Sequence, residues 1–233
     1  MTNEKRREFT HALSAAFPHT IPVLAGFLVL GIAYGMLMLN KGYGPGWSVL
    51  MSAVAFCGSM QFVAITLLTT VFRPVEALIL SLLVNARHLF YGLSMLEKYK
   101  GFGKIKAFLI YTLCDETFSI VSSATPPDGV EPKYFYLSIS LLDYLYWVTG
   151  TLLGGLLGGF LPFNTQGLDF ALTALFVVLF IEQMKKKENR IFGVIGVAVT
   201  VASRFLFGAD NLVLPALAGI LIILIAGRKV LCH

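Results

Sequence analysis

Charged side chains are scarce in this sequence. Asp, Glu, Lys and Arg together make up 13% of its 233 residues, whereas hydrophobic residues make up 57%. Soluble domains usually carry about 25% charged residues, and the mean hydropathy here is +0.78. A helix needs about 17–25 mostly apolar residues to cross a bilayer core, and such runs fill most of the chain from residue 21 to residue 227. The composition leaves no room for a separate soluble domain and predicts an all-α polytopic membrane protein.

The motifs of several chemistries are missing as well. The three cysteines, Cys57, Cys114 and Cys232, lie singly, so neither a disulfide framework nor a zinc site is expected. The sequence has no Walker lysine loop, no zinc-binding HExxH and no paired-aspartate motif, because FGAD at residues 207–210 lacks the second glycine of Gly-x-Gly-Asp. We therefore expect no cofactor and no metal, and an intramembrane enzyme is the least favoured function.

The net charge of +5 does not indicate a nucleic-acid partner. The basic residues cluster in short loops and at the termini rather than along one face, as they do when positive charge sets the orientation of membrane helices. The apolar run that follows the N-terminal NEKRRE is too long for a signal peptide and has no cleavage site behind it. We expect it to stay in place as the first membrane helix.

Turn residues divide the chain into eight apolar segments. Residues 1–17 are expected to form a cytoplasmic N-terminal segment and residues 18–233 a single transmembrane domain, with Pro18 and Pro22 shaping the start of the first helix. Such a chain has about 6–8 membrane helices. The segments lie at about 18–39, 47–71, 75–96, 105–123, 134–160, 168–184, 191–207 and 211–227.

Two of these segments, 47–71 and 105–123, are expected to be re-entrant or broken. The first contains FCGSMQF, where Gly58 and Ser59 favour a helix break, and the second contains LCDETFS, with two adjacent carboxylates at membrane depth. If every segment crosses the membrane, the lysines between residues 98 and 106 lie outside, against the positive-inside rule. If both segments return to the side from which they started, those lysines lie inside. Transporters use such breaks to build binding sites.

The segment 75–96 carries three polar residues far from its ends: Asn85, Arg87 and His88. An arginine at the centre of a membrane helix costs roughly 2.5–3.5 kcal/mol, so Arg87 needs water or a partner, for which Asp115 and Glu116 are the natural counter-charges. The alternative is that Arg87 and His88 snorkel or anchor helix packing. Their depth favours a role in a substrate or ion pathway.

Two further groups of polar residues are candidates for a site. Asp143 and Trp147 share a helix face with the glycines of GTLLGGLLGG, whose small residues favour close helix packing. Asp143 is therefore expected either to take part in helix packing or to belong to the site. Ser59 and Gln61 offer hydrogen-bonding groups at the expected break, where freed amides favour a carboxylate.

Six motifs follow one another in a characteristic order: GIAYG, MSAVAFCGSMQF, NARHLFYGLSM, DETFS, DYLYWVTGTLLGG and GLDFALTALFVVLF. Their order resembles the AzlC-like family, the large permease subunit of bacterial branched-chain amino acid exporters, and the resemblance covers nearly the whole chain. The resemblance implies export of leucine, isoleucine or valine across the inner membrane. It also implies a small AzlD-like membrane subunit as partner and an ion gradient as the source of energy. The positive-inside rule predicts that both termini are cytoplasmic.

The residues and the resemblance together give a hypothesis for binding. The carboxylate of an amino acid would face Arg87 and the amides near Ser59, with Asn85 and Gln61 as further polar contacts. Its ammonium would face Asp115, Glu116 or Asp143, and its apolar tail would lie near Phe62, Phe90 and Trp147. Protonation of His88 or of the pair Asp115 and Glu116 would couple transport to a proton gradient. A channel-like pore and a non-transporting membrane scaffold remain as alternatives.

Overall fold

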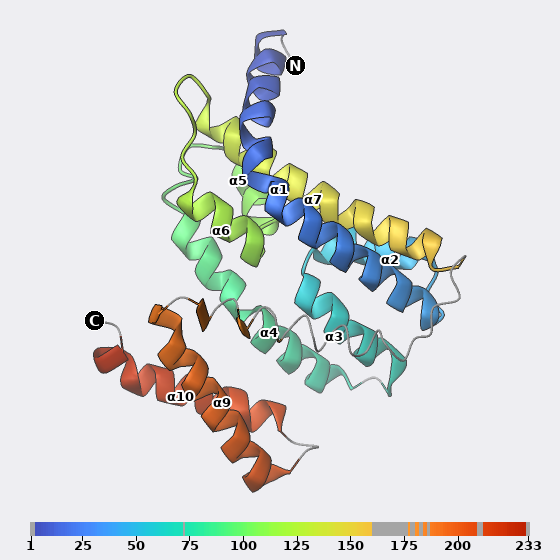
Figure 1. Ribbon diagram of the computed structural model, residues 1–233, viewed down its shortest axis with the longest axis vertical. Helices are drawn as coiled ribbons and strands as arrows, with labels where there is room; N and C mark the ends of the chain where they lie inside the picture. The colour runs from blue at the N-terminus through green and yellow to red at the C-terminus, as the bar shows by residue number, and fades with distance from the viewer. Residues whose placement is uncertain are drawn as a thin grey trace. The chain divides into compact units, whose positions relative to one another are not determined.

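A computed structural model describes residues 3–71, 73–159, 177, 180–181, 184–185, 187–208 and 212–231 (Figure 1). Within these ranges the secondary structure is helical and contains no strand, so the predicted all-α class is confirmed. Contacts divide the chain into two compact units, Met1–Leu168 and Asp169–His233, and each unit is described by itself. Three of the described helices are long and apolar enough to cross a membrane, at Arg6–Asn40, Ala77–Met95 and Arg190–Phe207.

The first helix, α1 (Asn3–Asn40), begins much earlier than predicted. Pro18 and Pro22 lie inside it, so the expectation that they shape its start is wrong. The helix continues because its N-terminal part packs against the rest of the unit through Ala12 and Ala16, which are fully buried. Figure 1 shows the first turns of α1 tilted away from the remainder of the helix, as expected where prolines remove backbone hydrogen bonds.

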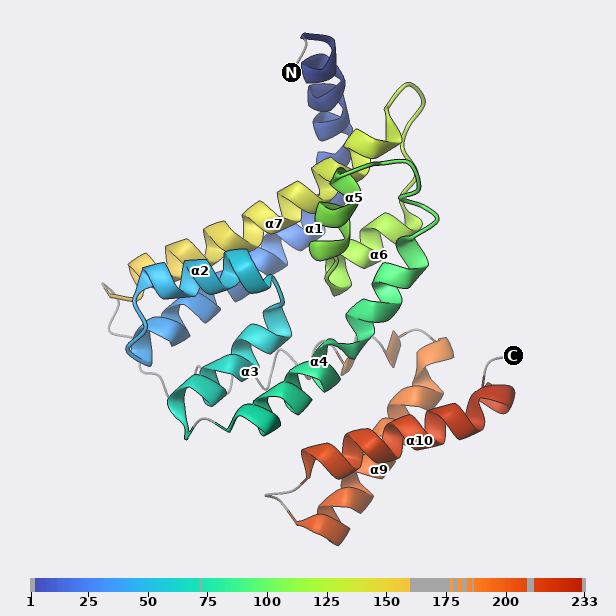
Figure 2. The same cartoon turned by 180° about the vertical axis from the view of Figure 1, so that it is seen from behind.

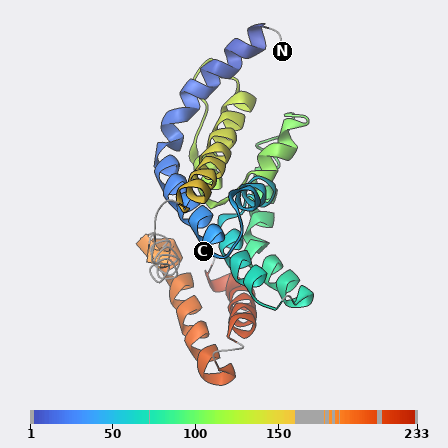
Figure 3. The ribbon, with the colours of Figure 1, turned by 90° about the vertical axis from the view of Figure 1, so that its right-hand side faces the viewer.

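The long helix α7 (Pro132–Leu157) runs parallel to α1 (Figure 3). Phe9 meets Tyr134 near the start of both helices, at 6.2 Å between ring centroids, and glycines meet backbone near their ends. A Cβ atom added at Gly154 would collide with the carbonyl oxygen of Ile32 on α1. The GTLLGGLLGG segment is therefore a helix-packing surface, as its small residues predicted.

Both segments predicted to be re-entrant or broken are indeed divided. The first forms α2 (Pro45–Ala55) and α3 (Gly58–Thr69), and the second forms α5 (Ile105–Tyr111) and α6 (Asp115–Ser123). Phe56, between α2 and α3, has a φ of 37°, in the left-handed region that few residues other than glycine adopt. At 1.5 Å per residue, none of the four half-helices is longer than about 18 Å, which is short of a bilayer core.

The direction of α4 (Pro74–Met95) decides how these segments lie. A buried cluster joins Met95, at the end of α4, to Ala12 near the start of α1 and to Phe135 near the start of α7. Helix α4 therefore runs antiparallel to α1 and α7 (Figure 2). If every segment crossed the membrane, α1 and α4 would be parallel, so this order agrees with two segments that turn back. It also places the lysines between residues 98 and 106 at the same end as the start of α1.

One of these lysines closes the end of α6. The Lys98 ammonium donates hydrogen bonds to the carbonyl oxygens of Val121, Ser122 and Ala124, which include carbonyls that a helix end leaves without an intrahelical partner. Burial lowers the pKa of Lys98.

In the second unit, α9 (Lys187–Phe207) and α10 (Val213–Leu231) pack against each other. The predicted helix 168–184 lies largely outside the described residues.

Candidate functional site

Arg87, on α4, joins the two broken segments. Its Nη1 atom lies 3.0 Å from Oδ2 of Asp115, the first residue of α6. Its Nη2 atom donates a hydrogen bond of 2.6 Å to Oγ of Ser59, the second residue of α3. The predicted counter-charge is thus Asp115, whereas Glu116 forms no ion pair in the part of the chain that the structure describes. One guanidinium contacts the first turns of two half-helices.

Other residues of α4 extend this cluster. Asn85 Oδ1 accepts a hydrogen bond of 2.8 Å from the Cys57 thiol, at the break between α2 and α3. The Tyr91 hydroxyl donates to Asp115 Oδ1 at 2.8 Å, so both oxygens of Asp115 have partners. The ring of Tyr91 stacks on Phe118 of α6, with centroids 4.4 Å apart, and His88 meets Tyr91 edge-on at 5.6 Å.

Helices α3 and α6 differ in the acidic residues of their first turns. The first turn of a helix carries free amides and a partial positive charge. In α6 this turn contains Asp115 and Glu116, whereas in α3 it contains no acidic residue, and Cys57 makes no side-chain cap. The amides at the start of α3 and the Arg87 guanidinium therefore form a positive region. Helix α3 contributes no carboxylate to it. Such a region favours an anion.

The end of α2 is fixed by two tyrosines that the sequence did not single out. The Tyr111 hydroxyl lies 2.6 Å from the carbonyl oxygen of Ala53 and 2.8 Å from that of Val54, and the Tyr144 hydroxyl donates to Ala53 at 3.0 Å. These hydroxyls satisfy carbonyls that the break leaves without helical partners. The break is thus held by α5 and α7.

Three predicted site residues pack together between α3 and α7. Trp147 Nε1 donates to Gln61 Oε1 at 2.9 Å, and Gln61 Nε2 donates to Ser52 Oγ at 2.8 Å. Phe62 is 5% exposed, and its ring lies 6.5 Å from that of Trp147. Among the described residues, none of these contacts includes Arg87. Gln61, Phe62 and Trp147 hold α3 and α7 together and are not gathered around the guanidinium.

Phe90 and Asp143 also lie apart from the Arg87 contacts. The Phe90 side chain is 68% exposed on α4. Asp143 on α7 is fully buried, and its Oδ2 atom accepts a hydrogen bond of 2.7 Å from Oγ1 of Thr117, the third residue of α6. Residues two apart on a helix point to nearly opposite sides. The first turn of α6 thus presents Asp115 to Arg87 and Thr117 to Asp143.

The ion pair itself is not enclosed by the described part of unit 1. The side chains of Arg87 and Asp115 are 42% and 35% exposed. Charged groups at membrane depth face a bundle interior or a water-filled space rather than lipid. The partial exposure of this pair leaves it open to a polar solute.

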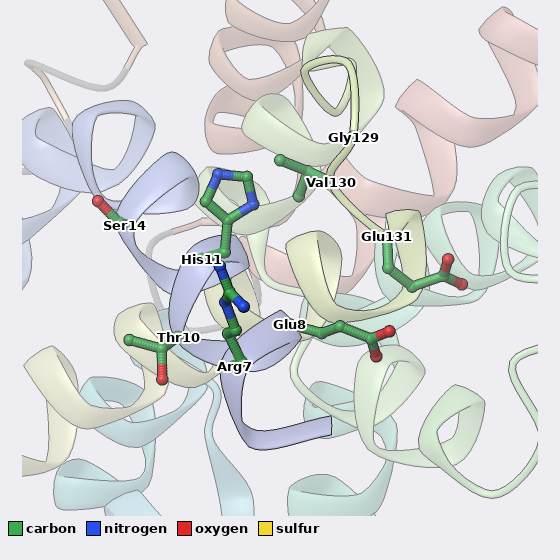
Figure 4. Close-up of a pocket in the computed structure, with 8 residues that line it drawn as sticks. All are labelled: Arg7, Glu8, Thr10, His11, Ser14, Gly129, Val130 and Glu131. Carbon is green, nitrogen blue, oxygen red and sulfur yellow. The ribbon is translucent and has the colours of Figure 1, made fainter. Parts of the chain in front are cut away.

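A separate hollow lies at the end of unit 1 where α1 begins (Figure 4). It has a volume of about 860 Å³. It is lined by Arg7, Glu8, Thr10, His11 and Ser14 of α1 and by Gly129, Val130 and Glu131 of the loop before α7. None of the predicted site residues lines it. The described residues contain no group of three or more His, Cys, Asp or Glu that is suited to hold a metal ion.

Comparison with known proteins places the chain in a family. The family model described as AzlC protein matches residues 22–161, a range that includes Arg87, Ser59 and Asp115. The chain belongs to the AzlC family. No solved structure matches it.

Relatives of this AzlC-family chain are similar along most of its length. The branched-chain amino acid transport protein AzlC of Bacillus subtilis is 48% identical over 225 residues, which cover 97% of this chain and 89% of the relative. An uncharacterized membrane protein of Helicobacter pylori is 42% identical, with 95% and 97% covered. The inner membrane protein YgaZ of Escherichia coli is 25% identical, with 73% and 72% covered. The apolar helices and these relatives identify a multi-pass membrane protein.

Proposed function

We propose that this AzlC-family protein is a secondary transporter that exports leucine, isoleucine and valine across the bacterial inner membrane. A small AzlD-like membrane subunit is its partner, and both termini are cytoplasmic. The observation that carries the proposal is the position of Arg87, which contacts two half-helix starts at membrane depth. The Bacillus subtilis relative is a branched-chain amino acid transport protein, which supports the substrate class.

The substrate carboxylate binds between Arg87 and the start of α3. This region offers a guanidinium, the Ser59 hydroxyl and the first amides of α3, with no acidic residue in that turn. An incoming carboxylate takes the place of Asp115 on the guanidinium. Asp115, released from Arg87, then faces the substrate ammonium. Substrate binding thus exchanges one ion pair within the protein for two between protein and substrate, and this exchange limits the desolvation cost.

The apolar tail of the substrate lies against the stacked rings of Tyr91 and Phe118. These rings adjoin Asp115, because the Tyr91 hydroxyl bonds to that carboxylate. An apolar wall of this kind favours larger side chains by about 0.8 kcal/mol for each buried CH₂ group. Leucine and isoleucine should therefore bind only a few times more tightly than valine. We assign no substrate contact to Asp143, whose resolved partner is Thr117.

Export of labelled leucine from dipeptide-loaded cells tests this function. Wild type, Arg87→Ala and the matched control Lys100→Ala are each expressed with a candidate small partner, and membrane abundance is measured for each. Lys100 lies in the loop after α4 and pairs only with the exposed Glu97 among the described residues. We expect Arg87→Ala to lose export and the control to keep it. Normal export by Arg87→Ala at normal abundance would contradict the proposed site.

A channel-like pore is separated from a carrier by kinetics. A carrier saturates with leucine and shows counterflow, in which unlabelled leucine on one side drives uptake of labelled leucine from the other. A pore shows neither. Counterflow that is absent in reconstituted wild-type protein, with and without the small partner, would favour the pore or a non-transporting scaffold.

A further inference from the structure

Asp143 is a fully buried carboxylate with an incomplete set of partners. Its Oδ2 atom accepts a hydrogen bond from Thr117, whereas its Oδ1 atom has no hydrogen-bond partner among the described residues. In the same part of the chain, no Lys, Arg or His forms an ion pair with it. A buried carboxylate without a counter-charge is strongly unfavourable. The ionised group therefore requires a cation, and the neutral group requires a proton.

The surroundings of Asp143 offer oxygen atoms and negative charge. Ser140 lies one turn earlier on α7, is fully buried, and its hydroxyl has no partner among the described residues. The Thr117 hydroxyl that bonds to Asp143 also lies 3.2 Å from the Cys114 thiol. Glu116 and Cys114 interact electrostatically with Asp143, and a negative charge on Glu116 adds to the attraction for a cation. Oxygen atoms around a carboxylate are the ligands that hard cations prefer.

The other helices that pack on α7 supply no competing positive charge to Asp143. Helix α2 contains no ionisable residue. On α5, the Lys106 ammonium donates instead to the carbonyl oxygen of Leu96. On α1, the His19 ring packs edge-on against Phe135, two turns before Asp143. In the described unit, the groups that act on Asp143 are thus acidic or neutral.

We propose that Asp143 binds the small monovalent cation, a proton or Na⁺, whose gradient drives the transport. The inference rests on the proposed transport function. It assigns coupling to Asp143 rather than to Asp115, because the charge of Asp115 is already compensated by Arg87 and Tyr91. The first turn of α6 connects the two events. Its Thr117 contacts the cation-binding carboxylate, and its Asp115 contacts the arginine that receives the substrate.

Cation binding at Asp143 changes what holds this turn of α6. An ionised Asp143 accepts the Thr117 hydrogen bond strongly, whereas a protonated or cation-bound Asp143 accepts it weakly, because charge strengthens a hydrogen bond. Occupation of Asp143 therefore loosens the start of α6 on one side while substrate binding loosens Asp115 on the other. Either ligand thus frees α6 to move, whereas the empty protein holds it, and this alternation couples inward movement of the cation to outward movement of the substrate.

Two transport modes of the full-length protein test this inference. Wild type and Asp143→Asn are reconstituted with the small partner in liposomes, and leucine counterflow is compared with uptake driven by an imposed pH gradient or an imposed Na⁺ gradient. We expect Asp143→Asn to keep counterflow within about twofold and to lose gradient-driven accumulation entirely. The gradient that drives wild type identifies the cation. If Asp143→Asn still accumulates leucine in response to the gradient, or if it loses counterflow at normal abundance, the inference is wrong.

A milder variant guards against misfolding of Asp143→Asn. Thr117→Val removes the hydroxyl that bonds to Asp143 and keeps the side-chain volume. The cation concentration that gives half-maximal coupling should shift by about tenfold, equivalent to one charged hydrogen bond. A proton is then held more tightly, because the ionised form has lost a donor, whereas Na⁺ is held less tightly, because it has lost a ligand. An unchanged concentration dependence would overturn the inference, whereas absent counterflow in wild type would overturn the transport function itself.

Discussion

Replacing Arg87 by glutamine should remove the preference of the protein for substrates that carry a carboxylate. In the structure the guanidinium engages Asp115 at 3.0 Å and Ser59 at 2.6 Å through two different nitrogen atoms. Glutamine keeps an amide donor but loses the charge, whereas lysine keeps the charge but offers a single ammonium that does not reproduce the fork. Comparing Arg87→Gln with Arg87→Lys therefore separates the effect of charge from that of geometry.

The expected size of the effect follows from the contacts and their exposure. A hydrogen bond to a charged group contributes about 1.5–3 kcal/mol, whereas a fully exposed ion pair contributes about 0–1 kcal/mol. Since the two side chains are 42% and 35% exposed, we expect an intermediate value. A loss of about 1–2 kcal/mol corresponds to about 5–30-fold in apparent affinity for leucine.

Inhibition of leucine counterflow by leucinamide measures this preference, because leucinamide has the side chain and ammonium of leucine but no carboxylate. In wild type, half-inhibition should need at least about tenfold more leucinamide than leucine. In Arg87→Gln the ratio should fall toward one, with Arg87→Lys between the two. If Arg87→Gln reached normal abundance and kept the wild-type ratio, the carboxylate would bind elsewhere and the reasoning would be refuted.

Three further predictions concern stability, measured by thermal unfolding of the purified protein. Gly154→Ala should destabilise the protein by about 1–3 kcal/mol, because its new methyl group meets the α1 backbone; Gly26→Ala, which meets no atom within 4 Å, is the control. Tyr111→Phe should cost about 1 kcal/mol, because it removes a hydroxyl that satisfies carbonyls at the end of α2, and an unchanged Tm would show that the break does not need it. Lys98→Met should lower stability by about 1 kcal/mol through loss of the contact with the end of α6, and an equal effect of Lys100→Met would contradict this reason.

Much of the fold was predictable because membrane helices leave simple chemical marks. Gly58 and Ser59 predicted a break in the segment 47–71, and the structure has it directly before Gly58. The start of α1 was mispredicted because Pro18 and Pro22 suggested a boundary. Tertiary packing of Ala12 and Ala16 overrides that local preference. The sequence does not show which residues will pack against an alanine.

The site was predictable where charge decides the contact and hidden elsewhere. An arginine at membrane depth requires a partner, and Asp115 was one of two acidic residues available to it. Tyr111 and Tyr144 were missed because their hydroxyls bind backbone carbonyls. Every residue has a backbone carbonyl, so the sequence does not show which one will accept the hydrogen bond. Gln61 and Trp147 were expected at a site, but they satisfy each other across 86 residues of sequence, a pairing that only the folded chain reveals.

The contact between α1 and α7 limits which parts of unit 1 are able to move. At Gly35 and Gly154 the two backbones touch with no side chain between them, and a single Cβ atom at either position would strike a carbonyl oxygen of the other helix. A slide by one residue or a modest rotation would bring a larger side chain into that space. The two longest described helices of the unit are therefore expected to keep one packing register. This contact does not hold the shorter helices of the unit, among them α6, whose 9 residues carry Asp115.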